Sequence, residues 1–129
     1  SCHCILVDEA QFVSAFVIDQ LREITAARDI PVICYGLRND FRTRLFEGSR
    51  RLLELADSIE ELKTTCAYCN RKAVFNLKSV DGKPTLDGPS QTLGCEELSL
   101  PACHTHYVEK LGLSAGQLHE LLSEPEETV

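Results

Sequence analysis

Residues 4–12 of the chain are Cys-Ile-Leu-Val-Asp-Glu-Ala-Gln-Phe, a short apolar run that continues into two acidic residues. Such a run predicts a strand buried on both faces of a parallel sheet. Open α/β sheets bind their ligands beside the carboxyl ends of their strands, and Asp8 and Glu9 stand at that end. We therefore predict that the two carboxylates face a ligand site. The alternative is that they only cap the helix that follows.

A helix and a second strand follow the acidic pair. Ser14 is a predicted N-cap, and apolar residues recur at helical spacing until residues 28–31, Arg-Asp-Ile-Pro, end the pattern: Val17, Ile18, Leu21 and Ile24. Residues 31–36 form another short apolar run, which closes in Gly36. Strand, helix and strand with short connections predict a right-handed βαβ unit, so we assign this half of the chain to the α/β class.

Residues 37–48 show no clean period and mix arginines with aromatic residues, which predicts a loop at the ligand-bearing edge of the sheet. Its arginines could face phosphate or only solvent, and both possibilities stay open: Arg38, Arg42 and Arg44. Ser49 is a predicted cap of a short helix through Asp57, and residues 58–65 are a predicted strand. We place the first domain at residues 1–65.

The second half changes character. Two predicted strands, residues 73–80 and about residues 91–100, flank residues 81–89, whose density of Gly and Pro marks a turn-rich loop. The last segment, residues 113–129, contains a capping-box pattern at Ser114 and Gln117, ahead of a short predicted helix and an acidic tail. The sequence thus predicts a small β module between the α/β half and the C-terminal segment.

Two ligand pairs mark this β module, which we place at residues 66–112. They are Cys66-x-x-Cys69 and Cys103-x-x-His106, and the two-residue spacing lets both side chains of a tight turn point at one ion. Three thiolates and an imidazole suit tetrahedral Zn²⁺. Because four protein ligands leave no position for a catalytic water, we predict a structural zinc site. The alternative is a set of scattered buried thiols with a surface histidine.

Other cysteines and histidines are weaker candidates. His104 rivals His106, but it directly follows Cys103, which strains a chelate, and Cys95 is a further rival. Cys2-His3-Cys4 alternates along a predicted strand, so the thiols and the imidazole point to opposite faces. We therefore predict no second metal there.

Composition narrows the class of protein and its partners. The chain has 13 basic and 20 acidic residues, a net charge of −7, which opposes a nucleic-acid partner because that function needs a basic face. No apolar run approaches the roughly 20 residues of a membrane span, and the N-terminus lacks the basic start and apolar core of a secretory signal. Seven cysteines, an odd number, favour free thiols in a reducing compartment. We therefore expect a cytoplasmic protein without membrane partners.

Three motifs, in order along the chain, resemble the zinc-containing thymidine kinases. They are residues 7–12, residues 34–41 (Cys-Tyr-Gly-Leu-Arg-Asn-Asp-Phe) with Phe46, and the two zinc pairs. The resemblance spans about residues 4–108 and the C-terminal two-thirds of that family. It implies a partial RecA-like P-loop-kinase sheet without its N-terminal third, a zinc-ribbon "lasso" domain that closes over the nucleoside, and a homotetramer. The implied reaction transfers the γ-phosphoryl of ATP to the 5′-hydroxyl of thymidine or deoxyuridine.

The resemblance also implies roles for single residues. Glu9 is the general base near the 5′-hydroxyl, and Asp8 is the Walker-B acid that holds the Mg²⁺ of Mg-ATP, usually through water. In this family, groups of the lasso domain also contact the thymine ring, and the resemblance assigns these contacts to Gly94 and Ser99. Four apolar residues match the positions that enclose the thymine ring: Phe12, Leu37, Phe41 and Phe46.

Departures from the family keep alternatives open. The family typically has Gly-Gly and then a Tyr over the nucleoside, where this chain has Gly94-Cys95 and Ser99, so a related kinase for another nucleoside is one alternative. A standalone zinc-ribbon interaction module is another. A phosphate cradle is Gly, four residues and Gly-Lys-Ser/Thr, but Gly82-Lys83 is followed by Pro84. We therefore expect the chain alone, without a P-loop segment, not to transfer phosphate.

Overall fold

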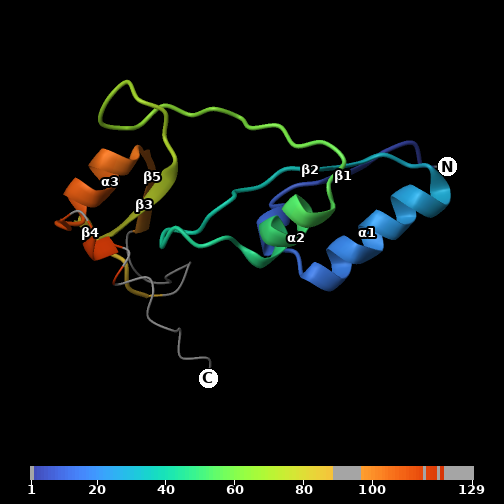
Figure 1. Cartoon of the computed structure of the whole chain (residues 1–129), viewed down its shortest axis with the longest axis horizontal. Coiled ribbons are helices and arrows are strands. Elements are labelled where there is room, and N and C mark those ends of the chain that lie inside the picture. The colour runs from blue at the N-terminus through green and yellow to red at the C-terminus, as the bar shows by residue number, and fades with distance from the viewer. Residues whose placement is uncertain (1, 89–96, 115, 119, 121–129) are drawn as a thin grey trace. The chain divides into compact units, whose positions relative to one another are not determined.

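The computed structural model describes residues 2–88, 97–114, 116–118 and 120 of the chain (Figure 1). The chain divides into two compact units, Ser1–Asp40 with Arg44–Glu61, and Phe41–Thr43 with Leu62–Val129. Among the described residues, the first unit contains a parallel strand pair with helices α1 and α2, and the second contains an antiparallel three-stranded sheet with helix α3. The predicted α/β class with a small β module is confirmed.

The first unit is built on a βαβ arrangement, as predicted. Strands β1 and β2 pair in parallel, with Ile5 opposite Val32 and Val7 opposite Cys34. Helix α1 connects the strands and packs against both β2 and helix α2. In chain order the elements are β1 (Ile5–Val7), the 3-10 helix η1 (Ala10–Phe12), α1 (Ala15–Arg28), β2 (Val32–Cys34) and α2 (Glu47–Leu55).

Helix α1 begins and ends where the sequence predicts. The Ser14 hydroxyl accepts a hydrogen bond from the backbone N–H of Val17 at 3.3 Å, which satisfies one of the amides that a helix start leaves without a partner. The helix ends at Arg28, and the C-cap residue Asp29 has a left-handed backbone (φ 53°) that turns the chain toward β2. Ile18 on the inner side is only 2% exposed and forms the core of this unit with Ala10.

The strand pair differs from its prediction, because it is not buried on both faces. Leu6 in β1 is 66% exposed and Ile33 in β2 is 44% exposed, whereas their neighbours Ile5 and Val7 are half-buried. Side chains alternate between the faces of a strand, and a parallel sheet is buried on both faces only where helices cover both. Within the described residues, helix packing covers one face of this pair.

Helix α2 also differs from its prediction. It begins at Glu47, after Phe46 as N-cap, so Ser49 lies inside the helix and is not its cap. The Ser49 side chain is buried and donates a hydrogen bond to the backbone carbonyl of Leu37, which ties α2 to the loop after β2. This long-range contact leaves no local pattern in the sequence.

The second unit is an antiparallel sheet with strand order β4-β3-β5, on which helix α3 packs. Strands β3 and β5 pair along their whole length, from Phe75 opposite Ala102 to Val80 opposite Glu97. The elements are β3 (Phe75–Val80), β4 (Lys83–Pro84), β5 (Glu97–Ala102) and α3 (His104–Lys110). Its core consists of buried residues from both strands, the helix and the ligand pairs: Cys66, Leu77, Ala102, Cys103 and Tyr107.

In the described part of residues 58–120, one predicted strand is absent, one helix is additional, and one predicted capping contact is present. Residues 58–65 do not form a strand, and only Thr65 makes an isolated bridge, to Lys72. Helix α3 was not predicted, because it is a single short helix with no repeating apolar pattern. The capping-box contact exists, since Ser114 N–H donates to Gln117 Oε1 at 2.6 Å, whereas residues 91–96 of the predicted strand and residues 121–129 of the tail lie outside the described residues.

The helices that the structure describes are too short or too polar to cross a bilayer. The longest of those described, α1, has 14 residues, about 21 Å at 1.5 Å per residue, against a hydrocarbon core of about 30 Å.

Tyr107 provides a test of how the second unit holds residues 41–43. The side chain is fully buried, and its hydroxyl donates a hydrogen bond to the backbone carbonyl of Phe41. We predict that Tyr107→Phe lowers the free energy of unfolding by about 1–3 kcal/mol, because it leaves a buried carbonyl without this donor. Urea denaturation followed by circular dichroism measures the change. Tyr35→Phe, at a ring 48% exposed, is the matched control, and an equal effect of both substitutions would contradict the prediction.

Candidate metal centre and strand-end site

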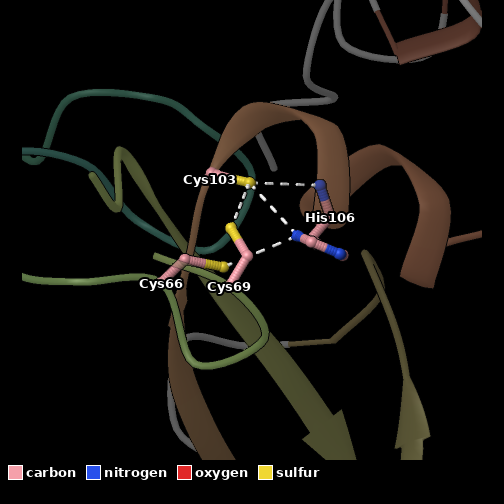
Figure 2. A group of neighbouring side chains, drawn as sticks. All are labelled: Cys66, Cys69, Cys103 and His106. Carbon is pink, nitrogen blue, oxygen red and sulfur yellow. Dashed lines mark hydrogen bonds between the residues drawn. The ribbon is translucent and has the colours of Figure 1, made fainter. Parts of the chain in front are cut away.

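The four predicted metal ligands come together in the second unit. The ligand atoms of Cys66, Cys69, Cys103 and His106 all lie within 4.8 Å of one another, and Figure 2 shows their side chains converging from two parts of the chain. The Cys69 and Cys103 sulfurs are 3.8 Å apart, and His106 Nδ1 lies 3.3 Å from the Cys103 sulfur. The alternative of scattered thiols with a surface histidine is therefore wrong.

These separations fit a tetrahedral zinc ion. Zn–S bonds of about 2.3 Å place two sulfurs about 3.8 Å apart at tetrahedral angles, and a Zn–N bond of about 2.1 Å places sulfur and nitrogen about 3.6 Å apart. Three of the six separations between the ligand atoms are 3.3 to 3.8 Å, and all six are within 4.8 Å. Three sulfurs and one imidazole nitrogen are also the donor types that zinc prefers. The cluster is therefore consistent with a structural zinc site, as the sequence predicts.

Two different local structures present the two ligand pairs. Cys66 and Cys69 lie on a turn that is closed by a hydrogen bond from Cys66 N–H to Arg71 O at 2.8 Å. Cys103 is instead the N-cap of α3, and its sulfur accepts from the backbone N–H of His106 at 3.5 Å. The spacing predicts a tight turn for both pairs, but the second pair spans a helix start. A capping residue and a side chain in the first helical turn can also point at one ion.

The close approach of the cysteine sulfurs in the cluster favours a bound cation. Desolvation acts to raise the pKa of Cys66, but hydrogen bonds from backbone amides and neighbouring thiols outweigh it and lower that pKa to about 6. The backbone N–H of Arg71 acts to lower the pKa of Cys69, but burial and the adjacent Cys103 and Cys66 raise it overall. Like charges at this distance oppose full ionisation of the sulfurs, and a divalent ion removes that opposition.

Among the described residues, the rival ligand His104 does not join the cluster. His104 turns away, and its ring lies 5.9 Å from that of Phe75. Cys95 lies outside the described residues. Cys2, His3 and Cys4 are exposed and form no metal-binding group among the residues that were described.

The acidic pair lies where the βαβ unit predicts, at the carboxyl end of β1. Both carboxylates are exposed, and Asp8 Oδ1 accepts a hydrogen bond from the backbone N–H of Glu9 at 2.9 Å. Glu9 has a left-handed backbone (φ 52°, ψ 40°), which is uncommon for a residue with a side chain. Glu9 is the N-cap residue of η1, but its carboxylate forms no capping hydrogen bond there.

Gln11 is a residue of this site that the sequence analysis missed. It is 2% exposed, its Nε2 donates to Glu9 Oε2 at 2.6 Å, and its Oε1 accepts from the backbone N–H of Leu37 at 3.2 Å. Its amide therefore joins the end of β1 to the loop after β2. The one available signal was a polar side chain between Ala10 and Phe12 in an otherwise apolar run.

Three of the predicted pocket residues lie in the first unit. Phe12 and Phe46 are in edge-to-face contact, with ring centroids 5.4 Å apart, and Phe12 stays 56% exposed. Leu37, 49% exposed, follows Gly36 at the end of β2 and is held by Gln11 and Ser49. An exposed aromatic ring beside a second ring offers a flat apolar surface to a ligand.

The other predicted pocket residues belong to the second unit. Phe41 is 8% exposed, and its ring lies 4.5 Å from Lys78 Nζ and 5.6 Å from the Arg42 guanidinium carbon. Arg42 Nε also donates to Leu86 O at 2.7 Å, so this guanidinium binds the protein itself. Ser99 is exposed and pairs with Lys78 across the sheet, whereas Gly94 lies outside the described residues.

The cluster predicts a zinc-dependent fold of the second unit. We expect one zinc per chain by elemental analysis, and we expect Cys103→Ser to lose most of it and to unfold this unit, because structural zinc supplies folding free energy directly. The zinc affinity should fall as the pH falls, since protons compete for the thiolates.

Cys34→Ser is the matched control for this experiment. Burial raises the pKa of the Cys34 thiol, which keeps it protonated, and Cys34 lies outside the cluster. A Cys103→Ser chain that keeps its zinc and its circular dichroism spectrum would contradict the prediction.

Comparison with known proteins gives the same family as the motifs. The thymidine kinase family model matches residues 1–107. The thymidine kinase of Streptococcus gordonii is 49% identical over 105 residues, 81% of this chain and 55% of that protein. The thymidine kinase of Pasteurella multocida is 51% identical over 112 residues, 86% of this chain and 58% of that protein.

A third relative extends the agreement. The thymidine kinase of Enterococcus faecalis is 46% identical over 104 residues, 81% of this chain and 54% of that protein. The chain thus spans about half the length of the curated relatives it matches. The family match includes both the strand-end acids and the four cysteine and histidine ligands. On this sequence match, with the zinc cluster in agreement, the chain belongs to the thymidine kinase family.

Proposed function

We propose that the protein carrying this chain is a thymidine kinase, which transfers the γ-phosphoryl of ATP to the 5′-hydroxyl of thymidine or deoxyuridine. The chain belongs to the thymidine kinase family, and the observation that carries the proposal is how its residues are arranged at the ends of β1 and β2. Asp8 and Glu9 follow β1, Leu37 follows β2, and Gln11 joins Glu9 to Leu37. In this proposal the chain contributes the general base and much of the nucleoside pocket, and a P-loop segment is needed for transfer.

Glu9 is the proposed general base. Its carboxylate is exposed, so a substrate hydroxyl can reach it, and the hydrogen bond from Gln11 holds one of its oxygens. As the 5′-oxygen bonds to the γ-phosphorus, the hydroxyl proton moves to the carboxylate of Glu9, and ADP is the leaving group. Positioning and charge stabilisation account for most of the catalysis of phosphoryl transfer, and a fixed carboxylate suits that requirement.

Asp8 is the proposed ligand of the magnesium in Mg-ATP, through water. Its Oδ1 is held by the backbone N–H of Glu9, which fixes the carboxylate beside the base. When bound, Mg²⁺ neutralises charge on the phosphate oxygens. In this proposal the carboxylate of Asp8 binds the metal, and the carboxylate of the adjacent Glu9 accepts the hydroxyl proton.

The proposed thymine pocket includes Phe12, Leu37 and Phe46. Their support is the exposed ring of Phe12, its edge-to-face contact with Phe46, and the two bonds that fix the backbone of Leu37. The roles proposed for Phe41, Gly94 and Ser99 rest on sequence resemblance alone. We further propose that the protein is a cytoplasmic homotetramer, which light scattering coupled to gel filtration tests.

Substitution of the base tests the proposed reaction. In the whole protein, Glu9→Gln keeps the size and the hydrogen-bonding reach of the side chain but cannot take up the proton. We expect it to lower kcat by about 10²–10⁴-fold with little change in the KM for thymidine. Glu23→Gln, at an exposed glutamate of α1, is the control. Full turnover by the Glu9→Gln protein, or a preference of the unaltered protein for deoxycytidine, would overturn the proposal.

Removal of one aromatic ring tests the pocket. We expect Phe12→Ala to weaken thymidine binding by about 5- to 150-fold, because a nucleobase stacked on an aromatic ring is stabilised by about 1–3 kcal/mol. Isothermal titration calorimetry with thymidine measures the change. Phe16→Ala removes a ring that is 70% exposed on α1 and is the matched control. Equal losses in the two proteins would exclude a specific role for Phe12.

A further inference from the structure

We propose that Gln11 is a positioning residue, which selects one orientation of the Glu9 carboxylate and couples it to the backbone of Leu37. The inference deepens the proposed function and rests on the role of Glu9 in it. Gln11 itself touches no reacting atom in this proposal. It acts through Glu9, which takes the proton, and through Leu37, which lines the proposed thymine pocket.

Both ends of the Gln11 amide are occupied. Nε2 donates to Glu9 Oε2 at 2.6 Å, and Oε1 accepts from the backbone N–H of Leu37 at 3.2 Å. The backbone N–H of Leu37 can only donate, so it must meet the oxygen of the amide. Nε2 is therefore left to face Glu9, and the direction of both bonds is fixed by chemistry.

The surroundings leave Gln11 little room to move. A Cβ on Gly36 would lie 2.6 Å from Gln11 Oε1 and 3.0 Å from Gln11 N, so the absence of a side chain there makes the space for the amide. A Cβ on Gly48 would collide with the backbone carbonyl of Ala10 and lie 3.0 Å from that of Gln11. Two glycines, one in the loop after β2 and one in α2, thus allow close packing around η1, and Gln11 is only 2% exposed.

A neutral donor is suited to this task. An exposed glutamate samples several rotamers, and a hydrogen bond to one oxygen selects among them before the substrate arrives. An amide does so without placing a positive charge on the base, whereas a lysine or arginine would form an ion pair that competes with proton uptake. Within the described residues, Glu9 Oε1 accepts no hydrogen bond, so the second oxygen remains available to the hydroxyl.

Two substitutions separate the two ends of the amide. Gln11→Glu keeps an oxygen for the N–H of Leu37 but replaces the amide donor by a second carboxyl oxygen, so it removes the bond to Glu9 and places a like charge beside it. We expect kcat to fall by about 10- to 100-fold and the KM for thymidine to stay within about threefold. Gln11→Met removes both bonds at similar volume, so we expect the same loss of kcat together with an increase in KM.

The measurements use the whole protein and a count of folded sites. Calorimetric stoichiometry with thymidine gives the fraction of competent protein, so a loss of folded protein is not mistaken for a loss of kcat. Gln20→Glu and Gln20→Met, at an exposed position of α1, are the matched controls. A purely structural role predicts lower stability and unchanged kcat per competent site, and that result would overturn the inference.

A double-mutant cycle with Glu9→Gln identifies the residue through which Gln11 acts. If Gln11 acts through Glu9, then Gln11→Glu changes kcat less than about twofold in a Glu9→Gln background. If the losses of kcat from Gln11→Glu and Glu9→Gln add in the double variant, the inference is overturned, but the role proposed for Glu9 is not affected. If Glu9→Gln alone leaves kcat unchanged, the proposed function of Glu9 fails and the inference fails with it.

Discussion

The parallel pairing of β1 and β2 is the constraint on which the rest of the first unit depends. Its register sets Val7 opposite Cys34, so the residues that follow each strand emerge at the same edge. Tyr35 N–H donates to Val7 O, and Ala10 N–H donates to Tyr35 O, both at 2.9 Å, which extends the pairing past the strands themselves. A shift by one residue would send the side chains to the opposite face and separate Glu9 from Leu37.

The second unit depends on a different interaction, the convergence of three sulfurs and one imidazole. Its three-stranded sheet is small, and its core consists largely of the residues that carry or adjoin the ligands. A domain of this size buries too little apolar surface to be stable without a cross-link, and a structural metal provides such a cross-link. The zinc cluster also joins two segments far apart in sequence, the turn at Cys66 and the start of α3 at Cys103.

The features that sequence predicted well are those encoded locally. The cap at Ser14, the βαβ order and the spacing of both ligand pairs each depend on neighbouring residues, and all three are confirmed. The features that were missed depend on tertiary contacts. Ser49 looked like a cap because it is a serine before an apolar run, but it bonds Leu37 O, and the exposed face at Leu6 depends on which elements cover it. The bridging role of Gln11 needs two strand ends in space, which no spacing rule reports.

Glu9 shows how the fold maintains an unfavourable local conformation at its candidate site. A left-handed backbone costs a residue with a side chain about 1–2 kcal/mol. The hydrogen bond of Gln11 to the carboxylate involves a charged group and contributes about 1.5–3 kcal/mol, and the amide bond from Ala10 to Tyr35 contributes about 0.5–1.5 kcal/mol. The bonds that hold this turn therefore offset its strain. Because the same Gln11 amide both offsets the strain and orients the carboxylate, the stability of the turn and the geometry of the proposed base depend on one side chain.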